Sequence, residues 1–416
     1  MSVELLQARI AKISADINLQ KEVLKQLEQS KSAAQRQLNA IRDPVAQLPP
    51  EISSEIFLRC RLPSWRSSNV RQAPMLLLKV CKAWRGIVLS TPALWADISL
   101  DSPRVEILEV WARRARNYPL SVTLYRGLGY HVTTSLAKFA QQLKHLTIYE
   151  ERLTSRSFQG LVPFPYLETL EVGANMNDDQ EYNAFSLRAM INLLRLTPNL
   201  LECTFHFLTT FLDHDTTDRL VISTLRSLKF SWSTWGFNED TEDRILKYLS
   251  LPALETLALP FSSLTTADFA SFLAYSSPPL RQLVLGDIAH VGFFGLEECL
   301  RLVPSVTYFE LYAKRNEQHM KDLFTSLADS PSTLLPNLHT LKIKHDCSSV
   351  SESVYDAYLH ALSVRRAQIV CAHVIKRDDY DDQEKPSLEV CAGLRQLAAG
   401  GMDIHIGTLK KNFIEI

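Results

Sequence analysis

The residues of this sequence that come nearest to a metal-binding or catalytic cluster lie between positions 203 and 214. Cys203 and His206 stand three residues apart in CTFH, and His214 follows within LDHDT. Cysteine and histidine at short spacing are residue types that ligate zinc. Cys203, however, occupies an apolar position of a recurring strand pattern, where a buried thiol is the simpler interpretation. The sequence therefore predicts no metal site at these residues.

Local motifs of the common enzyme classes are also absent from the sequence. There is no GxxxxGK[ST] phosphate loop, no GxSxG nucleophile elbow and no HExxH zinc helix. Gly127 and Gly129 lie in RGLGYHVT, but the third glycine of a dinucleotide-binding turn is missing. We therefore expect no catalytic residue and no cofactor, although catalytic residues brought together only by folding would leave no such pattern.

Composition restricts the class of protein further. Of the 416 residues, 46% are hydrophobic and 22% are charged, which is typical of folded globular chains. The formal net charge is −1 and no long basic block occurs, which disfavours nucleic acid as a partner. The sequence contains no run of about 18 apolar residues, so no membrane span is predicted. The first twenty residues do not resemble a signal peptide. Seven scattered cysteines, never spaced CxxC, are typical of buried thiols in a reducing compartment, so we expect the cytosol or nucleus.

The elements that precede any binding site begin with one long helix over residues 1–43. Apolar residues recur there at alternating spacings of four and three, the a/d pattern of a coiled coil. Without glycine or proline before Pro44, this helix can run roughly 60 Å. The pattern fits either self-association or packing against a neighbouring helix. Its eleven positions are Leu6, Ile10, Ile13, Ile17, Gln20, Leu24, Leu27, Lys31, Ala34, Leu38 and Ile41.

Residues 44–98 predict a small helical domain. Prolines at 49 and 50 suit the first turn of a helix, and Ile52, Ile56 and Cys60 then follow at spacings of four, with Phe57 beside them. A second helix is predicted over 74–90, PMLLLKVCKAWRGIVLS, and ends before Thr91-Pro92. One face of this second helix is apolar, and its members are Leu77, Val80, Cys81, Trp84 and Val88.

Residues 99–416 repeat a short strand pattern. A Leu-x-x-Leu-x-Leu motif, with related apolar residues allowed, recurs eight times at intervals of 24 to 33 residues. The eight occurrences are Leu143/Leu146/Ile148, Leu167/Leu170/Val172, Leu200/Cys203/Phe205, Leu225/Leu228/Phe230, Leu254/Leu257/Leu259, Leu280/Leu283/Leu285, Val306/Phe309/Leu311 and Leu338/Leu341/Ile343.

Helical patterns such as EDRILKYLSL, TADFASFLAYS and EQHMKDLFTSLA separate these strands. WADISL and YPLSVTLYRG predict two earlier strands, and LRQLAAGGMDIHIG predicts a closing helix and strand. The whole is expected to be an α/β solenoid of irregular leucine-rich repeats, an α/β horseshoe. It is irregular because the spacing varies and because the asparagine that follows a regular repeat strand occurs once, at Asn175.

The residues that alternate with the buried leucines are expected to form the concave, partner-binding face of this solenoid. They combine charges of both signs with aromatic rings, a composition suited to protein recognition. The candidates for binding a target protein are Tyr149, Glu171, His206, Lys229, Tyr308, Glu310, Tyr312 and Lys342, together with Ser231 and Lys344.

Residues 44–98 resemble an F-box, in the F-box-like form common in fungal families. The similar residues are Leu48-Pro49, Glu51-Ile52, Ile56-Phe57, Val80-Cys81, Trp84-Arg85 and STPALW at 90–95. The order of long helix, F-box-like segment, irregular repeats and closing GMDIHIG also resembles this family from end to end. The resemblance implies a substrate-recognition subunit of a cullin–RING ubiquitin ligase. Its F-box would bind a Skp-family adaptor, and through it a cullin, while its repeats would bind the target.

The apolar surface of the two short helices exceeds what their own small core requires, and such a surplus is typical of an interface. The candidate adaptor contacts are Leu48, Pro49, Ile52, Ile56, Leu77 and Trp84, with Trp84 also packing inside together with Val80 and Cys81. A second hypothesis uses the same residues: the helices cap the open end of a solenoid that is an interaction scaffold without ligase function. An enzyme is the third and is disfavoured by the absent motifs.

Overall fold

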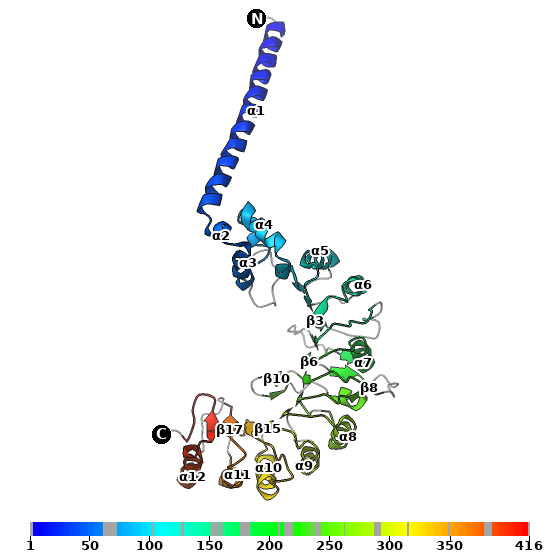
Figure 1. Cartoon of the computed structure of the whole chain (residues 1–416), viewed down its shortest axis with the longest axis vertical. Coiled ribbons are helices and arrows are strands. Elements are labelled where there is room, and N and C mark those ends of the chain that lie inside the picture. Colours follow the sequence, from blue (N-terminus) through cyan, green and yellow to red (C-terminus); the bar gives the residue numbers. More distant parts are fainter. Residues whose placement is uncertain are drawn as a thin grey trace. The chain divides into compact units, whose positions relative to one another are not determined.

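The computed structural model of the chain (Figure 1) contains two compact units. It describes residues 3–60, 73–101, 104–125, 129–150, 158, 161–174, 184–206, 209–211, 219–230, 232–233, 236–237, 243–261, 263–286, 293–313, 316–347, 350–377 and 385–414. The helical unit comprises Met1–Ser99 and Trp111–Tyr118, and the sheet unit comprises Leu100–Val110 and Pro119–Ile416.

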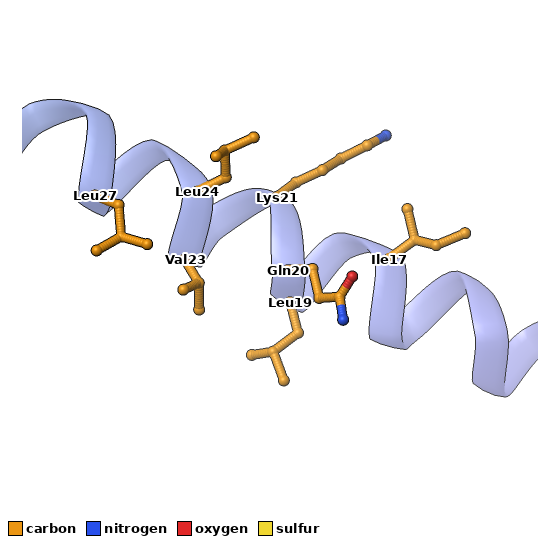
Figure 2. A pocket seen from close by; sticks show the side chains of 7 residues that line it. All are labelled: Ile17, Leu19, Gln20, Lys21, Val23, Leu24 and Leu27. Atoms are coloured by element: carbon orange, nitrogen blue, oxygen red, sulfur yellow. The ribbon is translucent and has the colours of Figure 1, made fainter.

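The N-terminal helix α1 (Val3–Arg42) is continuous over 40 residues. No proline or glycine interrupts it, and its bounds agree with the helix expected from the a/d pattern. The apolar side chains of that pattern are exposed, with Ile10 at 63% and Leu24 at 58%. Figure 2 shows part of this row, where Ile17, Leu24 and Leu27 line an open groove along the helix.

The rest of the helical unit is built from short elements: α2 (Pro44–Gln47), α3 (Pro50–Arg59), the 3₁₀ turn η2 (Leu77–Lys79), α4 (Lys82–Ser90) and the 3₁₀ turn η3 (Pro92–Trp95). The prediction of one helix over 74–90 is wrong. The backbone is extended at Cys81, and the Cys81 sulfur accepts a hydrogen bond from the Trp84 N–H at 3.5 Å, which caps α4. This cap starts a new helix and changes which side chains face inward.

The core of the helical unit is aromatic. Phe57 is 1% exposed and packs on Trp84 with ring centroids 4.9 Å apart. Trp95 is fully buried, donates from Nε1 to the Val88 carbonyl at 2.9 Å, and meets Trp111 edge to face at 5.3 Å. A buried indole with its N–H satisfied contributes apolar area without the cost of an unpaired donor.

Among the described residues, one sheet contains twelve strands whose spatial order follows the chain order, and all of them except most of β1 belong to the sheet unit. All neighbouring pairs from β2 to β18 are parallel. Its strands are β1 (Asp97–Leu100), β2 (Leu120–Leu124), β3 (Leu143–Glu150), β4 (Thr169–Ala174), β6 (Glu202–His206), β9 (Ser227–Phe230), β13 (Thr256–Leu259), β14 (Gln282–Leu285), β15 (Tyr308–Ala313), β16 (Thr340–His345), β17 (Cys371–Lys376) and β18 (Asp403–Thr408).

Within the part of the chain that the structure describes, three two-stranded ladders lie outside this sheet. They pair β5 (Ala184–Ser186) with β7 (Thr209–Phe211), β8 (Leu220–Val221) with β12 (Leu249–Ser250), and β10 (Trp232–Ser233) with β11 (Gly236–Phe237).

The repeated apolar motif explains the core of the sheet unit. Each of its eight occurrences ends in a strand of the large sheet, and every one of its three apolar positions is at most 1% exposed. The proline turns before the strands are tied to the preceding repeat. The side-chain amides of Asn199 and Asn337 donate to the carbonyls of Pro165 and Pro304 at 2.8 and 3.0 Å.

The helices α6–α12 lie along one face of the sheet (Figure 1). We call the other face, formed by side chains that alternate with the buried positions, the open face. EDRILKYLSL, expected to be helical, instead forms the 3₁₀ turn η4 (Arg244–Tyr248) followed by β12. The helices of the repeats are α5 (Val105–Ala115), α6 (Tyr130–Lys138), α7 (Leu187–Arg195), α8 (Thr266–Ser276), α9 (Phe293–Arg301), α10 (Glu317–Asp329), α11 (Glu352–Val364) and α12 (Leu388–Ala399).

Some predictions need correction or fall outside the described residues. The thiols of Cys60, Cys81 and Cys371 are exposed or half-buried, while the other four cysteines are buried as expected. Asn175, His214 and Ser231 lie outside the described ranges, and so does most of the acidic stretch RDDYDDQEKP at 377–386, whose composition predicts a solvated loop. Among the described helices, none combines the length and hydropathy of a membrane span.

Candidate functional site

Helix α3 has two different faces. Ser53 and Phe57 point into the helical unit and are at most 1% exposed. Ile52 and Ile56 lie on the other face, where 50% and 37% of each residue is exposed. Leu48, at 39%, and the exposed Pro49 precede them along the chain. We call these four exposed residues, Leu48, Pro49, Ile52 and Ile56, the α3 surface.

Polar contacts hold α3 with this surface outward. Ser53 donates from Oγ to the Val45 carbonyl at 2.8 Å, and Ser54 Oγ is hydrogen-bonded to Thr91 Oγ1, also at 2.8 Å. Both hydroxyls connect α3 to other elements of the helical unit. Because the serine side of the helix is satisfied within the unit, the isoleucine side is the one left to solvent.

The other two candidate adaptor contacts lie differently. Leu77 is only 6% exposed, so it offers little surface to a partner. Trp84 is half-buried against Phe57. Val80, expected to pack inside, is 53% exposed, and that prediction is wrong. Because the helical conformation is interrupted at Cys81, Val80 does not share the helical phase of the residues that follow it.

On the open face, strand register brings three of the predicted target-binding residues together. Gly173 of β4 lies between Tyr149 and His206 in the register of β3, β4 and β6. A Cβ at position 173 would lie 2.7 Å from the His206 Cβ, so only glycine allows this approach. The rings of Tyr149 and His206 are 5.8 Å apart, and His206 Nε2 lies 3.7 Å from Glu171 Oε2.

Tyr149, Glu171 and His206 form the first cluster on the open face, and the pKa values of its side chains follow from their packing. The pKa of Glu171 is lowered, chiefly by its polar interaction with the neighbouring His206 imidazole. Burial raises the pKa of Tyr149 to about 12, with a further contribution from Glu171. Tyr125 stacks on Tyr149 with centroids 5.4 Å apart. The cluster therefore combines two stacked tyrosine rings and an imidazole with one carboxylate, a composition suited to contact with a protein partner.

The remaining predicted residues lie further along the sheet. Lys229 is half-buried on β9 and pairs in register with Thr204. Glu310 is held by Lys344 at 2.8 Å and by the Tyr308 hydroxyl, while Lys342 Nζ lies 5.5 Å from the Tyr308 ring centroid.

Tyr308, Glu310, Tyr312, Lys342 and Lys344 form a second cluster on the open face. Tyr312 and Glu310, at 9% and 8% exposed, are its buried members. Tyr308, Lys342 and Lys344 are the partly exposed members.

A third group on the open face has no counterpart among the predicted residues. Cys371 Sγ lies 3.4 Å from His373 Nε2, and the same Nε2 lies 3.0 Å from Asp403 Oδ2. A catalytic Cys-His-Asp relay needs opposite ring nitrogens for thiol and carboxylate. Here one nitrogen serves both, and burial together with Asp403 raises the pKa of the Cys371 thiol to about 11. The arrangement is not that of an activated nucleophile.

Cys203 and His206, the pair nearest to a ligand cluster in the sequence, do not converge. Cys203 is 1% exposed on the helix side of the sheet, where burial raises the pKa of its thiol. His206, three residues later, lies on the open face with Tyr149 and Glu171. The interpretation of Cys203 as a buried core thiol is confirmed.

Comparison of the chain with protein-family models finds no match, and comparison with curated proteins finds none either.

The burial of His345, at the end of β16, predicts that the folded chain loses stability in acid. It is 2% exposed, and burial, with a contribution from Lys376, lowers its pKa to about 4, against a smaller opposing effect of Asp346. An unfolded chain therefore binds a proton at this histidine below about pH 6.5, whereas the folded chain does so only near pH 4. The free energy of unfolding should fall by about 3 kcal/mol between these pH values.

Urea denaturation at a series of pH values measures this dependence. His345→Asn should remove most of the slope between pH 6.5 and 4, while the same change at the exposed His339 should leave it. An unchanged slope in His345→Asn would assign the acid sensitivity to other groups.

Proposed function

We propose that this chain is the substrate-recognition subunit of an SCF-type cullin–RING ubiquitin ligase. The α3 surface binds a Skp-family adaptor, which connects the chain to a cullin. The observation that supports this most directly is the exposure of Leu48, Ile52 and Ile56, because the F-box resemblance assigns adaptor contacts to the same residues. Adjacent exposed aliphatic side chains on a well-anchored helix are typical of a protein interface.

In the same proposal the sheet unit is an irregular leucine-rich-repeat solenoid of horseshoe type. Twelve strands in chain order, with helices α6–α12 along one face of the sheet, are consistent with that architecture. The open face binds the target protein, with Tyr149, Tyr308 and Lys342 among the partly exposed contacts. The chain itself performs no catalysis, and ubiquitin transfer belongs to the other ligase subunits.

Adaptor binding tests the proposal. We expect the full chain to co-purify with a Skp-family adaptor and the double variant Leu48→Asp, Ile52→Asp to lose the complex. Burying each aliphatic side chain at an interface contributes roughly 1.5–3 kcal/mol, so affinity should fall at least about a hundredfold. Isothermal titration calorimetry measures the change.

A matched control introduces the same two charges elsewhere. Val370 and Leu388 are exposed aliphatic residues of the sheet unit, so Val370→Asp, Leu388→Asp should bind the adaptor as the wild type does. If the folded wild-type chain does not bind any Skp-family adaptor tested, the ligase proposal fails. The helices are then an end cap, and the chain is a repeat scaffold without ligase function.

We further propose that α1 pairs with α1 of a second copy as a parallel coiled coil. In the heptad register Asp16 occupies g and Lys21 the following e position, so the two charges attract between parallel copies. Lys31 at an a position and Gln20 at a d position favour a defined register over higher oligomers. The exposed aliphatic row along the helix supplies the rest of the interface.

A further inference from the structure

The last two strands of the sheet bring together four residues of types that ligate metals. Cys371 and His373 occupy alternate positions of β17, and Asp403 and His405 occupy alternate positions of β18. The register pairs Cys371 with Asp403 and His373 with His405. Residues two apart on a strand share a face, so all four belong to the open face. Lys342 of β16, a predicted target-binding residue, pairs in register with His373, so these four residues adjoin the cluster around Tyr308 and Glu310.

Three of the four donor atoms already converge. Sγ of Cys371, Nε2 of His373 and a carboxylate oxygen of Asp403 all lie within 4.8 Å of one another. In a tetrahedral zinc site with usual bond lengths, sulfur and nitrogen ligands are about 3.5 Å apart, and nitrogen and oxygen ligands about 3.3 Å. The observed separations are 3.4 and 3.0 Å. A metal ion could therefore be held with ångström-scale adjustment of side chains and no change of backbone.

We propose that Cys371, His373 and Asp403 form a binding site for one Zn²⁺ ion. Thiolate, imidazole and carboxylate together suit a borderline cation such as zinc, whereas calcium and magnesium prefer oxygen ligands alone. The thiolate and the carboxylate balance the charge of the dication. Metal binding displaces one proton from the thiol and requires the His373 Nε2 to be unprotonated.

The fourth coordination position is open to solvent at the edge of the site. Asp403 has 68% of its side chain exposed, so the ion would not be enclosed on that side. His405 stacks obliquely near His373, with centroids 5.7 Å apart, but its Nε2 is bound to the Thr408 carbonyl at 2.7 Å. The site therefore has three protein ligands and a fourth position for water or for a side chain of a bound partner.

Titration of the full chain with Co²⁺ tests the site, because a thiolate ligand gives a charge-transfer absorption band and tetrahedral cobalt gives intense visible bands. We expect one equivalent to bind and Zn²⁺ to displace it. Cys371→Ser and Asp403→Asn should each weaken binding, with about a hundredfold or greater loss for the thiol. Cys60→Ser, at an exposed free cysteine, should bind cobalt like the wild type.

Alkylation provides a second readout that does not depend on how the variants fold. Zn²⁺ should protect Cys371 of the wild-type chain from iodoacetamide, measured by mass spectrometry of its peptide, while Cys60 stays reactive. Equal modification of Cys371 with and without Zn²⁺, or an unchanged cobalt spectrum in Cys371→Ser, would overturn the proposal. The three residues would then be only a hydrogen-bonded group joining β17 to β18.

Discussion

Replacing Arg365 with methionine should lower the free energy of unfolding by about 3–5 kcal/mol, because four backbone carbonyls lose charge-assisted hydrogen bonds inside the protein. Arg365 is 1% exposed and ends α11. Its guanidinium donates to four backbone carbonyls, those of Leu327, Ser330, Leu334 and Leu335, at 2.7, 3.2, 2.6 and 3.0 Å. Methionine fills much of the same volume but leaves all four acceptors without this donor.

The position of these carbonyls explains why a buried cation is tolerated. Leu327 belongs to the last turn of α10, where helix carbonyls lack intrahelical partners. Leu335 has a left-handed backbone, with φ of 46°, which is unfavourable for a branched residue. Arg365 satisfies both segments at once. Burial lowers its pKa to about 10, so it stays charged at neutral pH and its hydrogen bonds are charge-assisted.

Urea denaturation followed by circular dichroism measures the loss. Arg366→Met is the matched control, since Arg366 is the next residue and is exposed, and we expect a change within about 0.5 kcal/mol. Arg365→Lys should fall between the two, because one ammonium group cannot reach four carbonyls. Equal stability of Arg365→Met and Arg366→Met would mean that water or backbone rearrangement replaces the guanidinium.

The strands of the large sheet could be predicted from the sequence wherever leucine or a similar large apolar residue occupies the repeated motif. In a motif such as Leu254/Leu257/Leu259, the last two residues share one face of a strand and the first anchors the turn, and all three are fully buried. β17 follows the same geometry with Ile369, Ala372 and Val374. Alanine in the central position hides the pattern, so neither this strand nor the polar residues on its open face could be singled out.

The outward face of α3 could also be predicted, because Ile52 and Ile56 repeat at helical spacing beside a buried Phe57. The interruption of the second helix at Cys81 could not be predicted. It depends on a cap made by the Cys81 sulfur, whose thiol also donates to Asp43 Oδ2 at 3.3 Å, thirty-eight residues away. Local propensity over 74–90 favours an uninterrupted helix, so the extended backbone at Cys81, after which Val80 no longer shares the phase of α4, could not be expected from the sequence.

Ligand clusters on strands follow a parity rule that short sequence motifs overlook. Cys203 and His206 are an odd number of residues apart, so a strand places them on opposite faces. Cys371 and His373 are two apart and share a face, but their partner Asp403 comes from the next strand, and only the register of β17 and β18 identifies it. Pairing between strands that are separated by a helix cannot be read from spacing alone.

Breaking the α1 seam should convert a dimer into a monomer. Ile17 and Leu24 occupy successive a positions and are 46% and 58% exposed along α1. Ile17→Glu, Leu24→Glu would place four carboxylates in the seam of a pair, where like charges and unburied aliphatic partners both oppose association. We expect sedimentation equilibrium to give twice the chain mass for the wild type and the single-chain mass for the variant.

The control adds the same charges on the outer face of the helix. Ala15→Glu, Gln29→Glu introduces two carboxylates at f positions, which a second copy does not contact, so this variant should remain dimeric. Gln20→Leu should raise the melting temperature of the dimer while weakening its selection of register, because polar seam residues oppose stability and favour one alignment. A wild-type chain that sediments as a monomer at all concentrations would leave the aliphatic row of α1 to a different helix, and the proposal of self-association would fail.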